Sequence, residues 1–315
     1  MPLAYPRDRP DAKRPAPAAR DSPVRACEAE GVCGRYANSR RPEDLIEEFE
    51  VERTDDPGPG SDPSGAGPDF NVAPTKDVPV VLRRELKAEQ TAEALDEEAP
   101  RPAPRMLRLL TWGLVPSWAK DRSVGSRMIN ARAESLLDKP AFRRAVLTRR
   151  CLVPADGWYE WQKSPSEKDA KGKPRKQPFW IHPGVDRPIA FAGIYEFWRD
   201  KTLEDADSGW LTTFSIITTE AEPGLDVIHD RMPFVVPEDR WDAWLDPALT
   251  DADDVRALLQ PPVPGRFVAT AVSTRVNAVV NNGPELLEPM PLADLRGVVD
   301  PATGELIGAG EAPLF

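Results

Sequence analysis

The chain has 315 residues, 40% apolar and 30% charged, enough for a soluble domain with a substantial core. Its net charge of −11 argues, taken as a whole, against a nucleic-acid partner, and its two histidines and three cysteines contain no pair at zinc-ligand spacing. We therefore expect no metal, no cofactor and no disulfide scaffold, and a cytoplasmic protein without a membrane anchor, since no apolar run approaches the ~20 residues of a membrane span.

Proline and charge separate a central domain from flanking segments. The chain has 36 prolines, about twice the usual share of roughly 5%. Residues 1–32 hold six of them among alternating charges, so this extension cannot bury enough apolar surface to offset its ordering entropy, and we expect it to be disordered. The expected boundaries are one domain over 33–289, flexible inserts near 53–69, 83–105 and 163–178, and a C-terminal tail over 290–315.

Charge is uneven along the chain. Residues 41–64 have a net charge of −7, and residues 237–256 and 285–315 contribute −5 each. In contrast, residues 101–150 contain twelve basic and three acidic side chains, a net of +9, and the 163–178 insert adds +4. The overall charge therefore leaves room for a basic face that can hold phosphates.

The predicted elements, in chain order, mix helices and strands. Apolar spacing predicts helices at 43–51, 131–147, 238–245 and 251–259, and aromatic and β-branched runs predict strands at 151–154, 157–162, 178–182, 188–198, 211–219 and 233–236. Because the strands cluster without regular βαβ alternation, we expect an α+β fold. Its single domain would surround a twisted, largely antiparallel, barrel-like sheet with flanking helices.

Six short runs are unusually polar for a core. They are VCGRYA (32–37), FNVAP (70–74), WGLVPSW (112–118), INARAE (129–134), PADGWYEW (154–161) and IHDRMP (228–233). Singly, each has an ordinary explanation: Asn130 can cap the helix that follows, Glu160 can point to solvent from a strand, and His229 can be structural. Cys151 and the tryptophans fit core packing.

Together and in this order, the runs resemble the SRAP family, the SOS response-associated peptidase proteins, over about residues 33–289. The resemblance implies that a mature N-terminal cysteine, here Cys33, forms a thiazolidine with the open-chain aldehyde of an abasic site in single-stranded DNA. It implies that Asn130, Glu160 and His229 line the pocket. DNA contacts are implied, by the same matching, for Arg35, Asn71, Pro74, Trp118, Arg132 and Arg231. The family often has a second aromatic directly after position 118, where this chain has Ala119.

The residue types suit that chemistry. An N-terminal cysteine has an α-amine with a pKa near ~7.7–8.0, so the amine is substantially neutral at physiological pH and can attack an aldehyde. The pKa of histidine lies near operating pH, so His229 can shuttle the proton that opens the closed sugar. Glu160 can hold the amine and Asn130 can orient the sugar. Arginines would position the backbone, and Trp118 and Pro74 would pack against bases.

Cys33 is internal in the printed sequence, and an amide nitrogen cannot form an imine. Three origins of residues 1–32 are compatible with this. Val32 stands where the family has methionine and can represent a GTG start codon, which we favour because it needs no unusual chemistry. Residues 1–32 can instead be a propeptide released at Val32–Cys33, or a genuine extension of a binder that does not crosslink.

We expect an abasic-site sensor that protects the lesion in the DNA damage response, with weak lyase activity as an accompaniment. A cysteine peptidase or autopeptidase using Cys33 and His229, and a non-catalytic single-strand DNA-binding module, remain as alternatives. The expected partner is single-stranded DNA with abasic sites, bound by a monomer in a bacterial cytoplasm and nucleoid-associated when bound.

Overall fold

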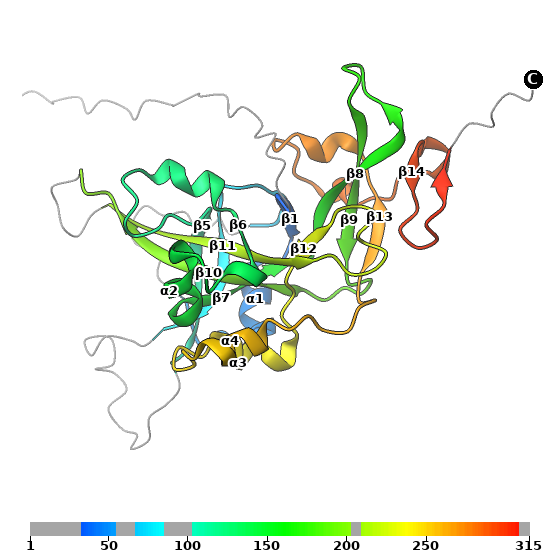
Figure 1. The fold of residues 1–315 in the computed structure, drawn as a ribbon. Helices are drawn as coiled ribbons and strands as arrows, with labels where there is room; N and C mark the ends of the chain where they lie inside the picture. Colours follow the sequence, from blue (N-terminus) through cyan, green and yellow to red (C-terminus); the bar gives the residue numbers. More distant parts are fainter. Residues whose placement is uncertain (1–32, 55–66, 85–102, 203–208, 309–315) are drawn as a thin grey trace, which may run out of the picture. The chain divides into compact units, whose positions relative to one another are not determined.

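The computed structural model describes residues 33–54, 67–84, 103–202 and 209–308, which Figure 1 shows as a coloured ribbon. The extension 1–32, most of the inserts expected near 53–69 and 83–105, and the end of the expected tail lie outside the described residues. Within the described ranges, no helix is long and apolar enough to cross a membrane.

Five strands of the described chain close on themselves into a barrel-like sheet. Strand β11 pairs antiparallel with β10 and parallel with β5, while antiparallel pairings join β10 to β7, β7 to β4 and β4 to β5. Strands β12 and β6 extend the sheet from β11, and β2 extends it from β5. The bounds are β2 (Arg53–Thr54), β4 (Asp77–Arg83), β5 (Arg105–Trp112), β6 (Asn130–Arg132), β7 (Arg150–Ala155), β10 (Ile189–Arg199), β11 (Trp210–Glu220) and β12 (Arg231–Pro233).

A second sheet has the strand order β13-β9-β8-β1-β3. Its strands are β1 (Arg35–Asn38), β3 (Asp69–Val72), β8 (Gly157–Lys168), β9 (Pro174–His182) and β13 (Val268–Ala271). A single residue, Asp156, separates β7 of the barrel from β8, so the chain passes directly from one sheet into the other. Strands β8 and β9 form a long hairpin that extends away from the barrel (Figure 1).

Apolar side chains form two main clusters around the barrel. One cluster lies where the two sheets meet and includes Trp112, Trp158 and Phe191, and the other lies under the helices and includes Phe142 and Trp244. The helices are α1 (Pro42–Glu48), α2 (Pro140–Thr148), α3 (Trp241–Leu245) and α4 (Ala252–Leu258), with 3₁₀ turns η3 (Arg122–Arg127), η4 (Ala133–Ser135), η5 (Glu238–Arg240), η6 (Thr274–Asn277), η7 (Pro284–Leu286) and η8 (Leu292–Asp294). Burying these clusters is the main term that stabilises the fold.

The segment after η8 returns to the β8 strand. Residues 298–299 and 306–307 form the small hairpin of β14 (Val298–Val299) and β15 (Leu306–Ile307). Both hydrogen-bonding groups of the Gln162 side chain bind the backbone of Val299, at 2.7 and 2.8 Å, and Leu295 and Val298 are buried. The described part of the expected tail therefore packs against the domain.

The α+β class and the barrel-like, largely antiparallel core are confirmed, and so are three of the four predicted helices. The helix predicted over 131–147 is wrong in its first half, because Ala131 pairs with Ile217 in a strand and helix α2 begins only at Pro140. The suggestion that Asn130 caps a helix is wrong for the same reason. Strands β1, β3, β4, β5 and β6 were not predicted.

Candidate functional site

Cys33 lies at the entrance to β1, buried between two other motif residues. Its side chain is 2% exposed and its backbone has a φ of +47°, which a residue other than glycine rarely adopts. The Cys33 backbone nitrogen donates a hydrogen bond to Glu160 Oε1 at 2.6 Å, and the Asn130 side-chain amide donates to the Cys33 carbonyl oxygen at 3.3 Å. The positions of Glu160 on β8 and Asn130 on β6 therefore fix Cys33 between the two sheets.

Glu160 is a buried carboxyl group, 3% exposed, and not a surface residue of β8. Burial raises its pKa to about 8, which the hydrogen bonds from Cys33 partly oppose and the charge of Asp230 reinforces. The glycine of the same motif explains how β8 comes so close to β9, since a Cβ at Gly157 would overlap the carbonyl oxygen of Ile181. Glu160 can therefore both accept and donate a proton near neutral pH.

The Cys33 thiol is protonated in this environment. Burial raises its pKa well above the ordinary value, and the charge of Glu160 and a hydrogen bond to that carboxyl raise it further. A cysteine that acts first as a thiolate nucleophile needs the opposite shift. The environment of Cys33 therefore disfavours its thiolate form.

His229 lies in the loop between β11 and β12, half-buried with 30% of its side chain exposed. Burial lowers its pKa, and the charges of Lys163, Arg231 and Lys176 lower it further, against the opposing charge of Asp230. The Arg231 backbone N–H donates to His229 Nδ1 at 3.1 Å, and Asp230 Oδ1 lies 2.9 Å from the same nitrogen. Within the described ranges, no hydrogen bond joins His229 directly to Cys33 or Glu160.

Asp230 and Glu134 are site residues that the motifs alone did not single out. Asp230 is 85% exposed, and its charge acts on the pKa of Cys33, Glu160 and His229. Glu134 grips the Arg231 guanidinium with two hydrogen bonds of 2.9 and 3.0 Å. Their place in the sequence, directly after His229 and at the end of the INARAE run, was the available signal.

Three of the predicted DNA contacts are engaged with protein groups. Arg231 is 9% exposed and held by Glu134 and the Thr218 carbonyl oxygen. Arg35 donates to Asn71 Oδ1 and the Val276 carbonyl oxygen, both at 2.9 Å. The Asn71 amide, fully buried, donates to three carbonyl oxygens of the loop at 276–281. Their DNA contacts stay predictions.

The other three predicted DNA contacts reach the surface. Trp118 is 65% exposed, in a loop anchored by the hydrogen bond of 2.8 Å from Trp198 Nε1 to the Ala119 carbonyl oxygen. Arg132 is exposed at the end of β6, two residues after Asn130, and its side chain makes no hydrogen bond or ion pair with the described residues. Pro74 is half-buried in the turn before β4. These side chains are available to a ligand.

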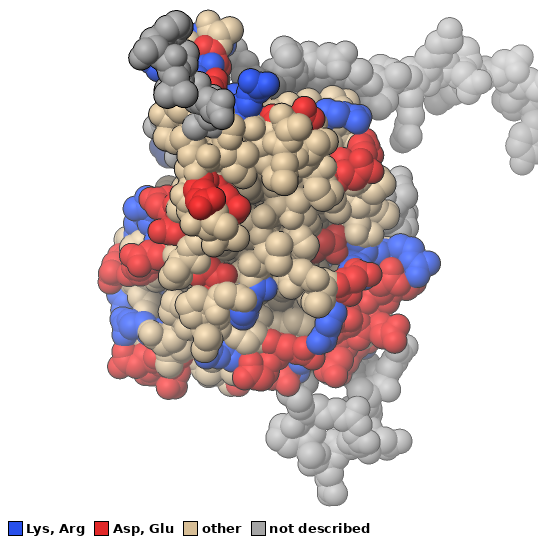
Figure 2. Space-filling view, turned by 90° about the vertical axis from the view of Figure 1, so that its right-hand side faces the viewer, with Lys and Arg blue, Asp and Glu red and all other residues tan. Residues whose placement is uncertain are grey.

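Surface charge around the domain is uneven. Figure 2 shows acidic side chains gathered at the lower right of one face and a broad uncharged area through its middle. Within the described ranges, no cluster of histidine, cysteine, aspartate and glutamate is arranged to hold a metal ion.

The chain matches the family model described as SOS response associated peptidase (SRAP) over residues 32–279. The chain belongs to the SRAP family. The abasic site processing protein YoqW of Bacillus subtilis (strain 168) is 35% identical over 257 residues, which are 82% of this chain and 99% of YoqW. The abasic site processing protein HMCES of Pongo abelii is 29% identical to this chain over 256 residues, which are 73% of this chain and 68% of HMCES.

A solved structure shares the SRAP fold with this chain. A protein from Bacteroides thetaiotaomicron has a TM-score of 0.63 at 22% identity, covering 82% of this chain and all of its own. The family resemblance carried by the six runs is thus confirmed.

Proposed function

We propose that this SRAP protein recognises abasic sites in single-stranded DNA and joins itself to them covalently through Cys33. Two of its relatives, YoqW and HMCES, are named abasic site processing proteins. The observation that carries the proposal is the 2.6 Å hydrogen bond between the Cys33 nitrogen and Glu160. It puts a buried proton acceptor on the atom that must attack an aldehyde.

The acid–base properties of the two groups match. Burial raises the pKa of Glu160 to about 8 beside the uncharged Cys33 nitrogen, and an α-amine has a pKa near ~7.7–8.0, so this carboxyl is a suitable acceptor for the amine proton. Glu160 removes the proton that blocks the amine lone pair and returns it when the hydroxyl group of the first adduct leaves as water. A fully exposed glutamate with an ordinary pKa would be a weaker base for this step.

The reaction proceeds in three steps: opening of the sugar, imine formation and ring closure. His229, kept neutral by its lowered pKa, helps the closed sugar open to its aldehyde by moving the proton of the sugar's anomeric hydroxyl group to the ring oxygen. The Cys33 amine adds to the aldehyde carbon, and loss of one water leaves an imine. The Cys33 sulfur then bonds to the same carbon and the thiol proton passes to the nitrogen, which closes the five-membered thiazolidine ring.

The mechanism requires a free amine on Cys33. In the active protein the bond between Val32 and Cys33 is therefore absent, either because translation starts at position 32 or because the preceding segment is removed. The match to the SRAP family model begins at residue 32, one position before Cys33. This supports Cys33 as the first residue of the reacting form.

Arg132 and Trp118 are the proposed contacts to the strand, since both side chains are exposed and Arg132 lies two residues after Asn130. Arg132 would bind a phosphate without reading sequence, and Trp118 and Pro74 would pack against bases. Arg35, Asn71 and Arg231 would have to exchange protein partners to touch DNA. Because one chain supplies every residue of the proposed site, a monomer is sufficient for the reaction. The compartment of this reaction, in our proposal, is the cytoplasm.

A cysteine peptidase is the second candidate, and the family description names that activity. The burial and raised pKa of the Cys33 thiol weaken it, because a peptidase uses a thiolate. Weak lyase activity is compatible with the main proposal, since an imine permits β-elimination. A module that only binds single strands would need neither a buried Cys33 nor a buried Glu160.

The test uses a chain that starts Met-Cys33 and single-stranded DNA with one abasic site, separated on a denaturing gel. We expect a heat-stable shifted band. Cys33→Ala keeps the α-amine but lacks the sulfur, so its adduct should appear only after borohydride reduction of the imine. No band under either condition, combined with salt-sensitive binding, would support the non-catalytic module. Cleavage of Val32–Cys33 in the full chain, lost in Cys33→Ala, would support the peptidase.

A further inference from the structure

Two lysines face each other across the stem of the β8–β9 hairpin. Lys163 and Lys176 are direct antiparallel partners, both are exposed, and neither side chain has a hydrogen bond or ion pair with the described residues. Like charges directly opposite each other destabilise a β-ladder. A bound anion between the two ammonium groups would remove that repulsion.

The lysine pair is close to the reacting residues. Lys163 follows Glu160 by three residues on β8, a separation of about 10 Å at the usual strand rise. Burial is the largest cause of the lowered pKa of His229, and the charges of Lys163, Arg231 and Lys176 lower it further. The lysine pair therefore acts electrostatically on the His229 loop as well. The hairpin stem therefore borders the site and is not only a remote solvated tip.

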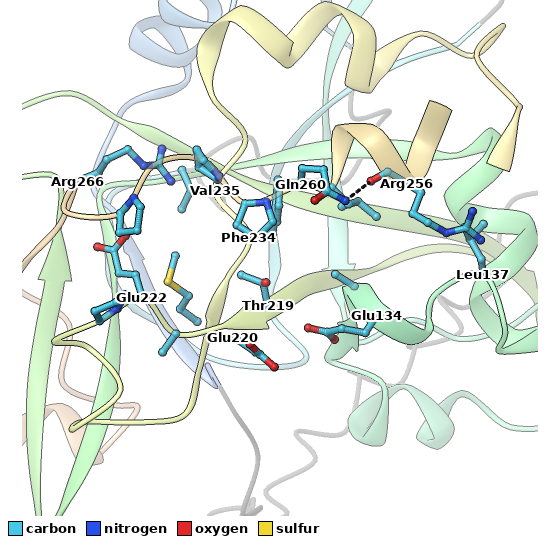
Figure 3. Close-up of a pocket in the computed structure, with 18 of the residues that line it drawn as sticks. Glu134, Leu137, Thr219, Glu220, Glu222, Phe234, Val235, Arg256, Gln260 and Arg266 are labelled. Atoms are coloured by element: carbon cyan, nitrogen blue, oxygen red, sulfur yellow. Dashed lines mark hydrogen bonds between the residues drawn. The ribbon is translucent and has the colours of Figure 1, made fainter. Parts of the chain in front are cut away.

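The groove beyond Arg231 is less suited to phosphate than the lysine pair. Beyond Arg231 lies a groove of about 540 Å³, lined by Glu134, Glu220 and Glu222 among others. Figure 3 shows Glu134 and Glu220 along its lower wall and Arg266 beside Glu222 at one end. The second arginine of the groove, Arg256, is paired with Asp253. A DNA backbone entering this groove would meet the carboxylates of Glu134, Glu220 and Glu222, the first of which already occupies the cation of Arg231.

We propose that Lys163 and Lys176 together bind one backbone phosphate of the DNA strand beside the His229 loop. The inference rests on the proposed function and extends it to the path of the strand. Cys33 is held between Asn130 on β6 and Glu160 on β8. Arg132 lies two residues beyond the first of these, and Lys163 lies three beyond the second on the other face of β8, so both strands that hold Cys33 carry an exposed cation near it.

The experiment measures binding apart from reaction. The chain starting Met-Cys33 is titrated with single-stranded DNA that carries a tetrahydrofuran abasic analogue, which has no aldehyde, at several salt concentrations. In Lys163→Gln/Lys176→Gln we expect affinity about tenfold weaker and a salt slope smaller by about 0.7, the value for one phosphate on a single strand. Lys163→Arg/Lys176→Arg should keep the slope of the unmodified chain.

The matched control removes two other exposed lysines, Lys139 before α2 and Lys201 in the turn after β10. Lys139→Gln/Lys201→Gln changes the net charge equally and should leave the slope unchanged. An unchanged salt slope in Lys163→Gln/Lys176→Gln, or an equal decrease of the slope in the control, would overturn this inference but leave the proposed function standing. An unmodified chain that neither binds the analogue in a salt-dependent way nor crosslinks would overturn the proposed function, and this inference with it.

Discussion

The backbone nitrogen of Cys33 and Oε1 of Glu160 lie 2.6 Å apart, although 127 residues separate them in the chain. The contact pairs a nitrogen that can become an α-amine with a carboxyl group whose pKa burial raises to about 8. The same burial and the same carboxyl group raise the pKa of the Cys33 thiol, so the sulfur stays protonated. Amine attack followed by sulfur closure is the order that this environment supports.

Replacing Glu160 tests the proton transfer. Glu160→Gln keeps the shape of the side chain but removes the base, so the crosslinking rate should fall by about 100-fold, the usual scale of general acid–base catalysis. Binding of the tetrahydrofuran analogue should be unchanged, because Glu160 is buried and touches no exposed surface. Equal crosslinking rates in the variant and the unmodified chain would remove Glu160 from the mechanism.

The same carboxyl predicts a pH dependence of folding stability. Its pKa is higher in the folded chain, about 8, than in the unfolded chain, where it is ordinary, so the folded state binds the proton more tightly between these values. Its contribution is fully present at acidic pH and is lost as pH rises towards 8. Denaturant unfolding should show that stability falls with pH by up to about 1.4 kcal/mol per unit more steeply than in Glu160→Gln. Parallel profiles for the two proteins would contradict the buried, raised carboxyl.

His229 and His182 are the two histidines of the chain, which makes their titration by NMR straightforward. Burial lowers the pKa of both, so both should titrate below the ordinary value. Asp230→Asn should lower the pKa of His229 further and Lys163→Gln/Lys176→Gln should raise it, while His182 serves as the internal control. A His229 that titrates at or above the ordinary value would show that the ring is charged more often than the proton-shuttle role allows.

The two arginines of the site should separate by salt dependence. Arg132→Gln should reduce the salt slope of single-strand binding by about 0.7, because Arg132 is exposed and binds no described residue. Glu134→Gln should instead destabilise the fold by about 1–2 kcal/mol, since it weakens the grip on the buried Arg231, with the half-exposed position of Glu134 limiting the loss. A salt slope that falls with Arg231→Gln but not with Arg132→Gln would reverse the assignment.

Trp118 offers a test of base stacking. Because its side chain is 65% exposed, Trp118→Ala should leave stability unchanged while weakening single-strand binding by about 1–3 kcal/mol, the usual value for one stacked base. Trp118→Phe should restore part of the loss. Because the chain has nine tryptophans, the measurement is the DNA-induced fluorescence quenching that is lost in Trp118→Ala, and affinity that is insensitive to Trp118→Ala would assign the tryptophan to another surface role.

The sequence predicted the central strands well because their pattern is local. Aromatic and β-branched runs marked β8, β10 and β11. The helix predicted over 131–147 began too early because Leu136, Leu137 and Phe142 have helical spacing, whereas the pairing of Ala131 with Ile217 depends on a strand 86 positions away. Local periodicity contains no information about such partners.

At the site, too, the sequence predicted residue types but not the contacts between distant residues. Cys33, Asn130 and Glu160 come together as the motif resemblance implied, but nothing in the spacing of these residues predicts their contact. Arg231 looked like a phosphate ligand because the cation of an arginine is visible in a sequence, while its carboxylate partner, Glu134, lies 97 residues away. The burial that raises the pKa of Glu160 likewise arises only when two sheets meet around it.

The most direct test of the covalent proposal is the mass of the adduct. The chain starting Met-Cys33 is incubated with abasic single-stranded DNA without any reductant, digested, and analysed by mass spectrometry. We predict an adduct that equals protein plus DNA minus one water, located on Cys33, with no free thiol left on that residue. An adduct on a lysine, or the masses of the two unmodified components alone, would contradict the proposed chemistry.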